Sequence, residues 1–481
     1  MPISPPRRGR AGPPAMLRFT PLALASLVLA GCASFSPDGG FGRVEQLTQD
    51  RTGLKPSLQR SAEASAAART RIDELLRQPL SADGAVELAL LGNRDLQARY
   101  ADLGIAEADL VRAGRLANPS FTFGRLSGHG AVEIDRAVIF DVLGLLTLPV
   151  ARQVEQQRFE QAQLQAAYAT VDVAADARRA YFEAVTAEQL VGYHLQVQEA
   201  ADATSELARR MLAAGNFSKL AQMREQAFQA EASVQLARAR HQAVAARERL
   251  VRALGWDGDA AALKLPERLP DLPAKPAQPR DAEQMAMARR LDVLMARRDA
   301  EATARALGLT RATRFINVLH AGYQNQSTSG EPRSNGYEIE LSLPLFDFGQ
   351  ARVARAEAIY MQSVDRAAAV ATRARSEVRE AVSAYRTAFE LARHYRDEVV
   401  PLRQRISDEQ LLRYNGMLAS VFELLADSRD QVAAVTAAIE AQRDYWIADT
   451  RLQTALTGLS PTGASAVAPA AATPAAAGAA H

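Results

Sequence analysis

Long stretches of the sequence carry apolar residues at the spacing of a helix seam. No proline occurs between Pro149 and Pro266, so a helix can continue there over many turns. Steps of three, four and seven residues separate Leu164, Tyr168, Val171, Ala175, Phe182 and Val185. This heptad spacing is typical of a coiled coil. Gly215 supplies a break, and a second helix is expected from about Ser218 to Leu254.

Other segments alternate strictly between apolar and polar residues. The alternation covers Phe121 to Gly124, Phe315 to Tyr323 and Tyr337 to Leu343. Such a period of two predicts strands with one apolar and one polar face. The polar segment from Gln324 to Gly336 is expected to be the loop between the last two strands. A further strand before Pro149 has no clear position in the pattern.

Three landmarks recur in the same order at nearly the same offset. Asp95 corresponds to Asp292, Pro149 to Pro344 and Gly215 to Gly416, at offsets of 197, 195 and 201 residues. Matches in one order indicate an internal duplication, in which each copy reads as helix, two strands, helix, turn and helix. The last helices are expected from Ala351 to Val400, Leu402 to Tyr414 and Ala419 to Leu456, with Pro401 as a kink or cap.

The N-terminus has the organisation of a secretory signal. Four arginines precede an apolar run from Leu22 to Val28, which is too short to span a bilayer as a helix. The segment Leu29-Ala30-Gly31-Cys32 resembles the lipobox of bacterial lipoproteins, and Cys32 is the only cysteine of the chain. We therefore expect Cys32 to carry a lipid. A soluble periplasmic protein with a chance cysteine is the alternative, and the start codon is Met1 or Met16.

These observations divide the chain into six segments. They are a lipoprotein signal peptide (1–31), a periplasmic lead-in (32–80), repeat 1 (81–263), a proline-rich linker (264–281), repeat 2 (282–459) and a disordered Ala/Pro tail (460–481). Each repeat contains a helix, a strand pair and a helical hairpin.

Charge and composition narrow the classes of partner. The formal net charge is +2, and removal of residues 1–31 takes away four arginines and no acid, which leaves −2. No nucleic-acid partner is therefore indicated. Beyond the signal, no apolar run approaches the ~20 residues of a membrane helix, so a membrane-crossing mature chain requires a closed β-barrel.

No grouping of chemically reactive residues is visible. The six histidines are scattered, and they show no metal-ligand spacing. A phosphate-binding glycine loop is also missing. We therefore expect neither an enzyme nor a resident cofactor or metal ion.

Four strands are too few to close a barrel within one chain. Two, three or four copies would give eight, twelve or sixteen strands, all of them even and all allowed. Strand arithmetic does not choose among these numbers. Periodicity alone also fits two amphipathic hairpins packed on a soluble helical body.

Several segments resemble the TolC-like outer-membrane factor family. They are Leu341 to Val353 at a strand-to-helix junction, Ala113 to Pro119, Ala85 to Leu90, Tyr414 to Gly416 and Phe422 to Asp427. With the lipobox and the Val400-Pro401 step they extend over nearly the whole mature chain. The first copy departs from the family pattern, because Phe140 to Pro149 lacks a clear Pro-Leu-Phe-Asp junction.

The resemblance implies a mainly α fold. Long coiled-coil helical hairpins would form a periplasmic tunnel, and four β-strands per chain would contribute to a trimeric transmembrane β-barrel. The protein would be the outer-membrane channel of a tripartite efflux or export system. Its partners would be two further copies, outer-membrane lipid, a periplasmic adaptor (membrane fusion protein) and an inner-membrane transporter, expected to be proton-driven.

The same resemblance places candidate functional residues. Gly215, Asn216, Asn415 and Gly416 would lie at hairpin tips that meet the adaptor, and Glu423 and Asp427 would form a tunnel constriction. Both carboxylates also fit ordinary solvated positions on a helix.

A non-conducting periplasmic coiled-coil scaffold lipoprotein is the competing interpretation. Only a conduit requires the alternating strands and their junction with the helices. A lipoprotein enzyme is a distant third possibility. The cargo, whether drug, metal cation or polypeptide, is not indicated by the sequence.

Overall fold

The computed structural model describes residues 34–458, except residues 129–130, 278, 316–317, 343–345, 417 and 420. Cys32, the predicted signal peptide, Pro344 and the predicted tail from residue 460 lie outside the described residues. The helices before the second strand pair are α2 (Phe41–Thr52), α3 (Ala62–Leu76), α4 (Ala82–Gly92), α5 (Arg94–Ala113), α6 (Val142–Ala213), α7 (Lys219–Leu254), η2 (Ala260–Ala262), α8 (Ala282–Arg289) and α9 (Leu291–Ala312). The helices after it are α10 (Gln350–His394), the π-helical turn η3 (Tyr395–Val399), α11 (Val400–Asn415) and α12 (Val421–Thr457).

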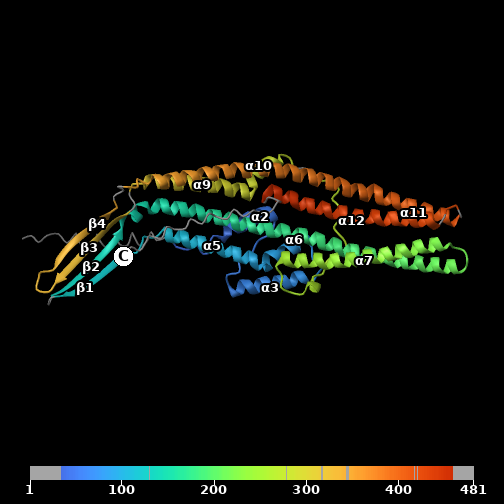
Figure 1. The fold of residues 1–481 in the computed structure, drawn as a ribbon, viewed down its shortest axis with the longest axis horizontal. Coiled ribbons are helices and arrows are strands. Elements are labelled where there is room, and N and C mark those ends of the chain that lie inside the picture. The colour runs from blue at the N-terminus through green and yellow to red at the C-terminus, as the bar shows by residue number, and fades with distance from the viewer. Residues whose placement is uncertain are drawn as a thin grey trace, which may run out of the picture. The chain divides into compact units, whose positions relative to one another are not determined.

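The order of elements repeats, as the duplication predicts. Two helices, two strands and a long helical hairpin follow one another in each half (Figure 1). Asp95 and Asp292 both lie in the first turn of their helices, α5 and α9. The predicted mainly α fold with four strands per chain is confirmed.

The described residues form two compact units, and each unit takes residues from both repeats. The first contains the sheet and consists of residues 34–39, Ile105–Phe159 and Leu309–Val353. The second contains most of the helices and consists of residues Gly40–Gly104, Glu160–Gly308 and 354–458.

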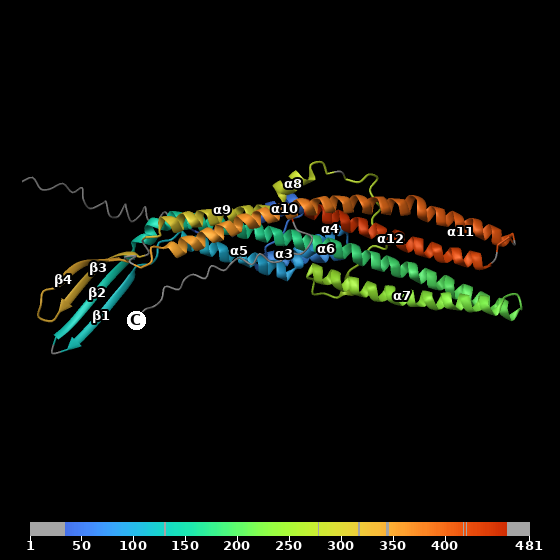
Figure 2. The same ribbon diagram turned by 45° about the horizontal axis from the view of Figure 1, so that its top comes forward.

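The four strands form one antiparallel sheet in the order β1-β2-β3-β4. The strands are β1 (Ser120–Gly128), β2 (Ala131–Asp141), β3 (Leu319–Thr328) and β4 (Ser334–Leu341), and Figure 2 shows them side by side. The strand that the sequence pattern could not place is β2. It pairs with β1 in the first copy and with β3 in the second, so it joins the two copies within the sheet.

Strand β3 begins and ends later than predicted, and the predicted loop from Gln324 to Gly336 is correspondingly wrong. The connection between β3 and β4 is only residues 329–333. Polar residues extend the strand because their side chains bond across the sheet. Gln324 bonds the Glu338 carboxylate, and Gln326 bonds Glu133.

Helix α6 begins at Val142, whereas the sequence pattern started it after Pro149. The cause is Asp141, whose carboxylate accepts a 2.8 Å hydrogen bond from the Gly144 amide in the first turn. Pro149 lies inside the helix, where its ring removes one hydrogen bond. Its predicted counterpart Pro344 lies outside the described residues, and α10 begins at Gln350.

Four of the six predicted seam residues of α6 are buried, and Leu164 and Tyr168 are partly buried. The buried surface of the helix extends beyond this seam. Val171, Ala175, Phe182 and Val185 are buried, and so are many alanines around the helix between residues 166 and 184. Small alanine side chains let several helices approach α6 at once. A coiled-coil pattern therefore describes only part of its packing.

Two apolar clusters lie in the core of the helical unit, among the residues that the structure describes. The first joins α4, α6 and α7 around Leu88, Phe182 and Leu250. The second joins α8, α10 and α12 around Val378, Tyr385, Tyr445 and Leu452. Trp446 packs against both clusters, and its ring stacks on Phe182 at 5.4 Å between centroids. An aromatic pair thus connects the two repeats.

Candidate functional site

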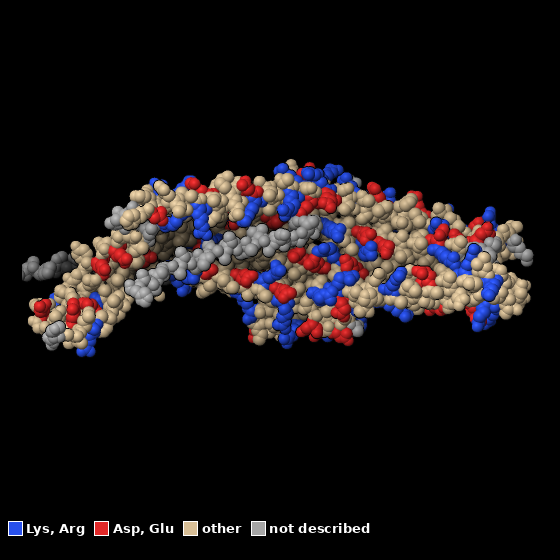
Figure 3. Space-filling model, in the orientation of Figure 1, with Lys and Arg blue, Asp and Glu red and all other residues tan. Residues whose placement is uncertain are grey.

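The two faces of the sheet differ sharply in chemistry. Residues that pair across antiparallel strands point to the same face. One face carries the carboxylates of Glu133, Asp135, Asp141, Glu338 and Glu340. No strand residue on this face is lysine or arginine. In Figure 3 acidic side chains are visible over the strands at the left.

Cross-strand hydrogen bonds confirm this register. His320 Nδ1 lies 3.0 Å from the Glu340 carboxylate, and the bonds of Gln324 and Gln326 lie on the same face. The opposite face carries the predicted apolar residues. It presents Phe121, Phe123, Val138, Phe140, Leu319, Tyr323, Tyr337, Ile339 and Leu341, and most of these side chains are exposed. Such a sheet suits apolar surroundings on one side and water on the other.

The first hairpin tip is a helix end closed by a left-handed glycine. Gly215 has φ 75°, and its amide bonds the Leu212 carbonyl at 3.0 Å. The Asn216 amide bonds the Met211 carbonyl at 2.9 Å, which completes a Schellman motif. Ser218 then caps α7, because its hydroxyl accepts a bond from the Ala221 amide. The turn is thus closed by two backbone hydrogen bonds and by the Ser218 side chain.

The second tip is built differently. Gly416 has φ −80°, a conformation that any residue adopts, and its amide bonds the Leu412 carbonyl at 2.9 Å. Asn415 is the last residue of α11 and is exposed. Leu418, just beyond, exposes 83% of its surface. Gly416 corresponds to Gly215 in sequence but does not need to be glycine for its backbone.

Glu423 and Asp427 lie one turn apart on α12, in its first two turns. Glu423 is exposed, whereas Asp427 is partly buried. The Asp427 Oδ2 atom is fully buried, with no hydrogen-bond partner among the described residues. The structure thus places both predicted carboxylates on one face of a helix close to a hairpin tip.

A third carboxylate, which sequence reasoning missed, occupies the equivalent place in the first hairpin. Glu225 is the seventh residue of α7, as Asp427 is of α12. It is 2% exposed, and its Oε2 atom also has no hydrogen-bond partner among the described residues. Burial raises the pKa of Glu225, and Arg429 partly opposes this shift. The nearest repeat offset, 201 residues, leads from Asp427 to Gln226, one residue beyond Glu225.

Arg429 on α12 connects the two hairpins at this level. The Nη2 atom of Arg429 lies 3.8 Å from the Oε1 atom of Glu225. The Cζ atom of Arg429 lies 4.8 Å from the centre of the Phe228 ring. Both partners belong to α7. Arg429 therefore gives the buried Glu225 its opposite charge and also stacks on a neighbouring aromatic side chain.

A buried ion-pair network holds the start of α9. Arg290 is fully buried and donates to Asp292 at 2.6 Å and to Glu377 on α10 at 2.7 Å. Burial lowers the pKa of Arg290, but the two carboxylates outweigh it and the net shift is upward. In sequence, Asp292 was only a landmark of the repeat. The other partner of Arg290, Glu377, is 87 residues away from it, so no local pattern could reveal the network.

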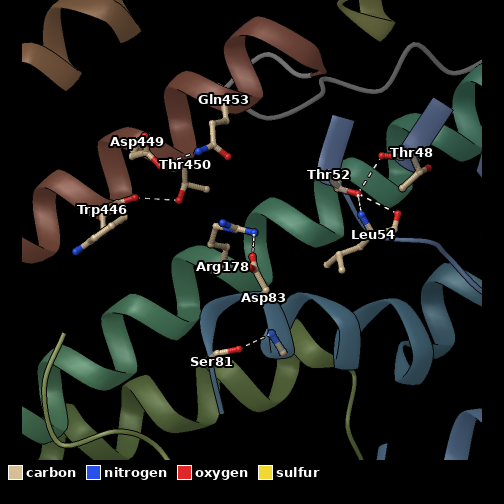
Figure 4. A network of polar contacts seen from close by, with 11 residues as sticks. Thr48, Thr52, Leu54, Ser81, Asp83, Arg178, Trp446, Asp449, Thr450 and Gln453 are labelled. Carbon is tan, nitrogen blue, oxygen red and sulfur yellow. Dashed lines mark hydrogen bonds and ion pairs between the residues drawn. The ribbon is translucent and has the colours of Figure 1, made fainter. Parts of the chain in front are cut away.

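Polar groups also meet between α2, α4, α6 and α12 (Figure 4). Arg178 pairs with Asp83, and Ser81 caps α4 by accepting from the Gly84 amide at 3.0 Å. Burial raises the pKa of Asp449, and Arg178 opposes this shift. The hydroxyls of Thr52 and Thr450 bond carbonyls of their own helices. Of these contacts, the pair Arg178–Asp83 joins two helices, and the set contains no arrangement of nucleophile and base.

The part of the chain that the structure describes contains no cluster of three or more potential metal-ligating side chains. Among its helices, none combines the length and the apolar character required to cross a membrane.

Comparisons with known proteins place the fold. No family model and no curated protein matches the sequence. Solved structures do match, among them a membrane protein from Pseudomonas aeruginosa, with 21% identity, TM-score 0.67, and coverage of 77% of this chain and 92% of that one. The outer membrane protein VceC from Vibrio cholerae has 17% identity, TM-score 0.64, and coverage of 83% and 99%. The chain has the fold of an outer-membrane channel.

The open state of the MtrE outer membrane channel from Neisseria gonorrhoeae also has this outer-membrane channel fold. It shows 17% identity, TM-score 0.62, and coverage of 78% of this chain and 88% of that one. The resemblance inferred from the sequence is thereby confirmed for the fold.

Proposed function

We propose that this protein is the outer-membrane channel of a tripartite efflux or export system. It passively conducts substrates from a periplasmic adaptor and an inner-membrane transporter, which we expect to be proton-driven, to the exterior. The amphipathic sheet carries this proposal. A scaffold lipoprotein has no need for strands with an apolar face exposed on one side and carboxylates on the other.

The functional unit in this proposal is a homotrimer. Strands β1 and β4 are the edges of the sheet, and neither has a further partner strand among the described residues. Unpaired edges favour association, and association of identical chains into a closed ring removes them. Three copies would give twelve strands, an even number that suits a transmembrane barrel. The apolar face would then meet lipid and the acidic face would line the lumen.

The remaining residues take their roles from this arrangement. Cys32 carries the lipid that anchors the chain to the outer membrane. Gly215, Asn216, Asn415 and Gly416 lie at the tips that contact the adaptor. Glu423 and Asp427 form the constriction, where three copies of each carboxylate would face the axis and attract cations. The exposure of Glu423 beside a tip supports this assignment.

Reconstitution into a planar bilayer, together with the mass in mild detergent, tests the proposal. A trimer that gives discrete conductance steps is the expected result. A monomer without conductance would instead favour the scaffold lipoprotein. In the same bilayer, Glu423→Gln should weaken block by divalent cations, and unchanged block would remove Glu423 from the constriction.

A further inference from the structure

The apolar face of the sheet is short for a bilayer. Its continuous apolar rows run from Leu319 and Leu341, at the helical end, to Tyr323 and Tyr337. Four steps from residue to residue, at about 3.3 Å each, give roughly 13 Å along the strands. Transmembrane barrels carry an apolar band about 25 Å tall. The sheet therefore supplies about half of the required height, and strand tilt reduces this share further.

A polar row closes the band on the side of the hairpin turns. Arg136, Asn325 and Asn335 occupy the next position on the same face of three neighbouring strands. Arg136 donates to Asn325 at 3.0 Å, and Asn325 donates to Asn335 at 2.7 Å. A charged residue on the lipid face of a barrel is tolerated near the headgroups and costly at the midplane. The missing height must then lie on the other side, toward the helices.

The first two turns of α6 provide an apolar surface on that side. Asp141 ends β2 and caps α6, so the helix starts without a linker. Leu145, Leu146, Pro149 and Val150 are all exposed, and Leu146 exposes 67% of its surface. Their spacing of one, three and one residues places them on one helix face. Residues 142–150 rise about 12 Å at 1.5 Å per residue, which matches the missing height.

The same helix face becomes polar immediately afterwards. Arg152, Gln153 and Gln156 are exposed and lie in line with Leu145 and Leu146 at helical spacing. The change from apolar to polar is complete within two residues of Val150. The second copy shows a related change. Phe346, which is 99% exposed, and Phe348 precede α10, which opens with Gln350 and Arg352. Aromatic residues are enriched at bilayer interfaces.

We propose that the lipid bilayer extends past the strands and covers the first two turns of α6, with its periplasmic boundary between Val150 and Gln153. This inference rests on the proposed channel function, because it requires the apolar face of the sheet to meet lipid. Leu145, Leu146, Pro149 and Val150 complete the apolar band. Phe346 and Phe348 lie at the corresponding boundary in the second copy.

Photo-crosslinking of the full-length protein in lipid vesicles tests this boundary. p-Benzoylphenylalanine would replace Leu146, Gln153 or Tyr337 in separate variants, which leaves Cys32 untouched. Lipid adducts are expected at positions 146 and 337, with at least a tenfold loss at position 153. A crosslinked dimer at position 146 would show that a second copy covers this face, and would overturn the inference.

The lipid adduct at position 337 distinguishes a wrong bilayer boundary from a wrong channel assignment. A lipid adduct at 337 without one at 146 would place α6 in water or lumen and overturn only the boundary. No adduct at 337 would count against the channel itself. A second measurement uses Leu145→Gln with Leu146→Gln, which should increase extraction from vesicles by urea several-fold. The matched variant Leu207→Gln changes an equally exposed leucine further along α6 and should leave extraction unchanged.

Discussion

The two repeats place the same elements in the same order but build equivalent points with different chemistry. At the break between the first two helices, the first copy uses Asn93, which accepts a 3.0 Å hydrogen bond from the Leu96 amide. The second copy places Arg290 there, buried between Asp292 and Glu377. A cap satisfies one helix end locally, whereas the ion pairs connect α9 to a distant helix.

The long hairpins differ in the same way. Helix α6 continues for 72 residues and ends in a Schellman turn at Gly215. Its counterpart is divided by the π-helical turn η3, directly before Pro401, and reaches a tip whose glycine has an ordinary φ. Proline removes a helix hydrogen bond, and a π turn accommodates the displaced carbonyls. Duplication has thus preserved the positions of helices and strands while the contacts that fix them diverged.

The two repeats should differ most in the stability that the break between their first two helices contributes. Arg290→Met would leave the buried Glu377 and the partly buried Asp292 without their cation, which should destabilise the protein by about 3–5 kcal/mol. Asn93→Ala removes one cap and should cost about 1 kcal/mol. The apparent melting temperature, followed by circular dichroism, measures both effects.

A combined variant provides the control for this comparison. Arg290→Met with Asp292→Asn and Glu377→Gln removes the stranded charges and should recover part of the loss. If Arg290→Met alone costs no more than Asn93→Ala, the ion pairs do not hold the break, and the two copies are equivalent there.

The sequence predicts elements better than it predicts their contacts, for physical reasons. Helices and strands follow from local spacing, so the seam of α6 and three of the four strands were recognisable. Strand β2 was not, because Arg136 and Asp135 interrupt its apolar pattern and its partners come from both copies. The start of α6 was missed because one cap, Asp141, determines it. Glu225 and Glu377 acquire their environment from helices far away in sequence, which no local pattern records.

The two hairpin tips should differ by an intermediate amount in the stability cost of replacing their glycine. Gly215→Ala forces an alanine into φ 75°, which should cost about 1–2 kcal/mol although the space around it is open. Gly416→Ala keeps an ordinary φ, and its Cβ would meet the Leu412 carbonyl at 3.5 Å, a normal contact. This change should be neutral within about 0.5 kcal/mol or slightly stabilising. Equal losses in melting temperature for the two variants would contradict the difference between the tips.

The smallest difference concerns the two equivalent carboxylates near the tips. The pKa of Glu225 is raised by burial, so the folded protein binds its proton more tightly than the unfolded chain. The contribution to stability is full below about pH 4.5 and is lost as the pH rises through the raised value. Glu225→Gln imitates the protonated form and should stabilise the protein at pH 7.5, with no gain at pH 4. Asp427→Asn, at the equivalent position of α12, is the matched control variant. The melting temperatures of both variants between pH 4 and pH 7.5 provide the measurement. A lower melting temperature for Glu225→Gln at neutral pH would mean that the ion pair with Arg429 outweighs the cost of burying the charge.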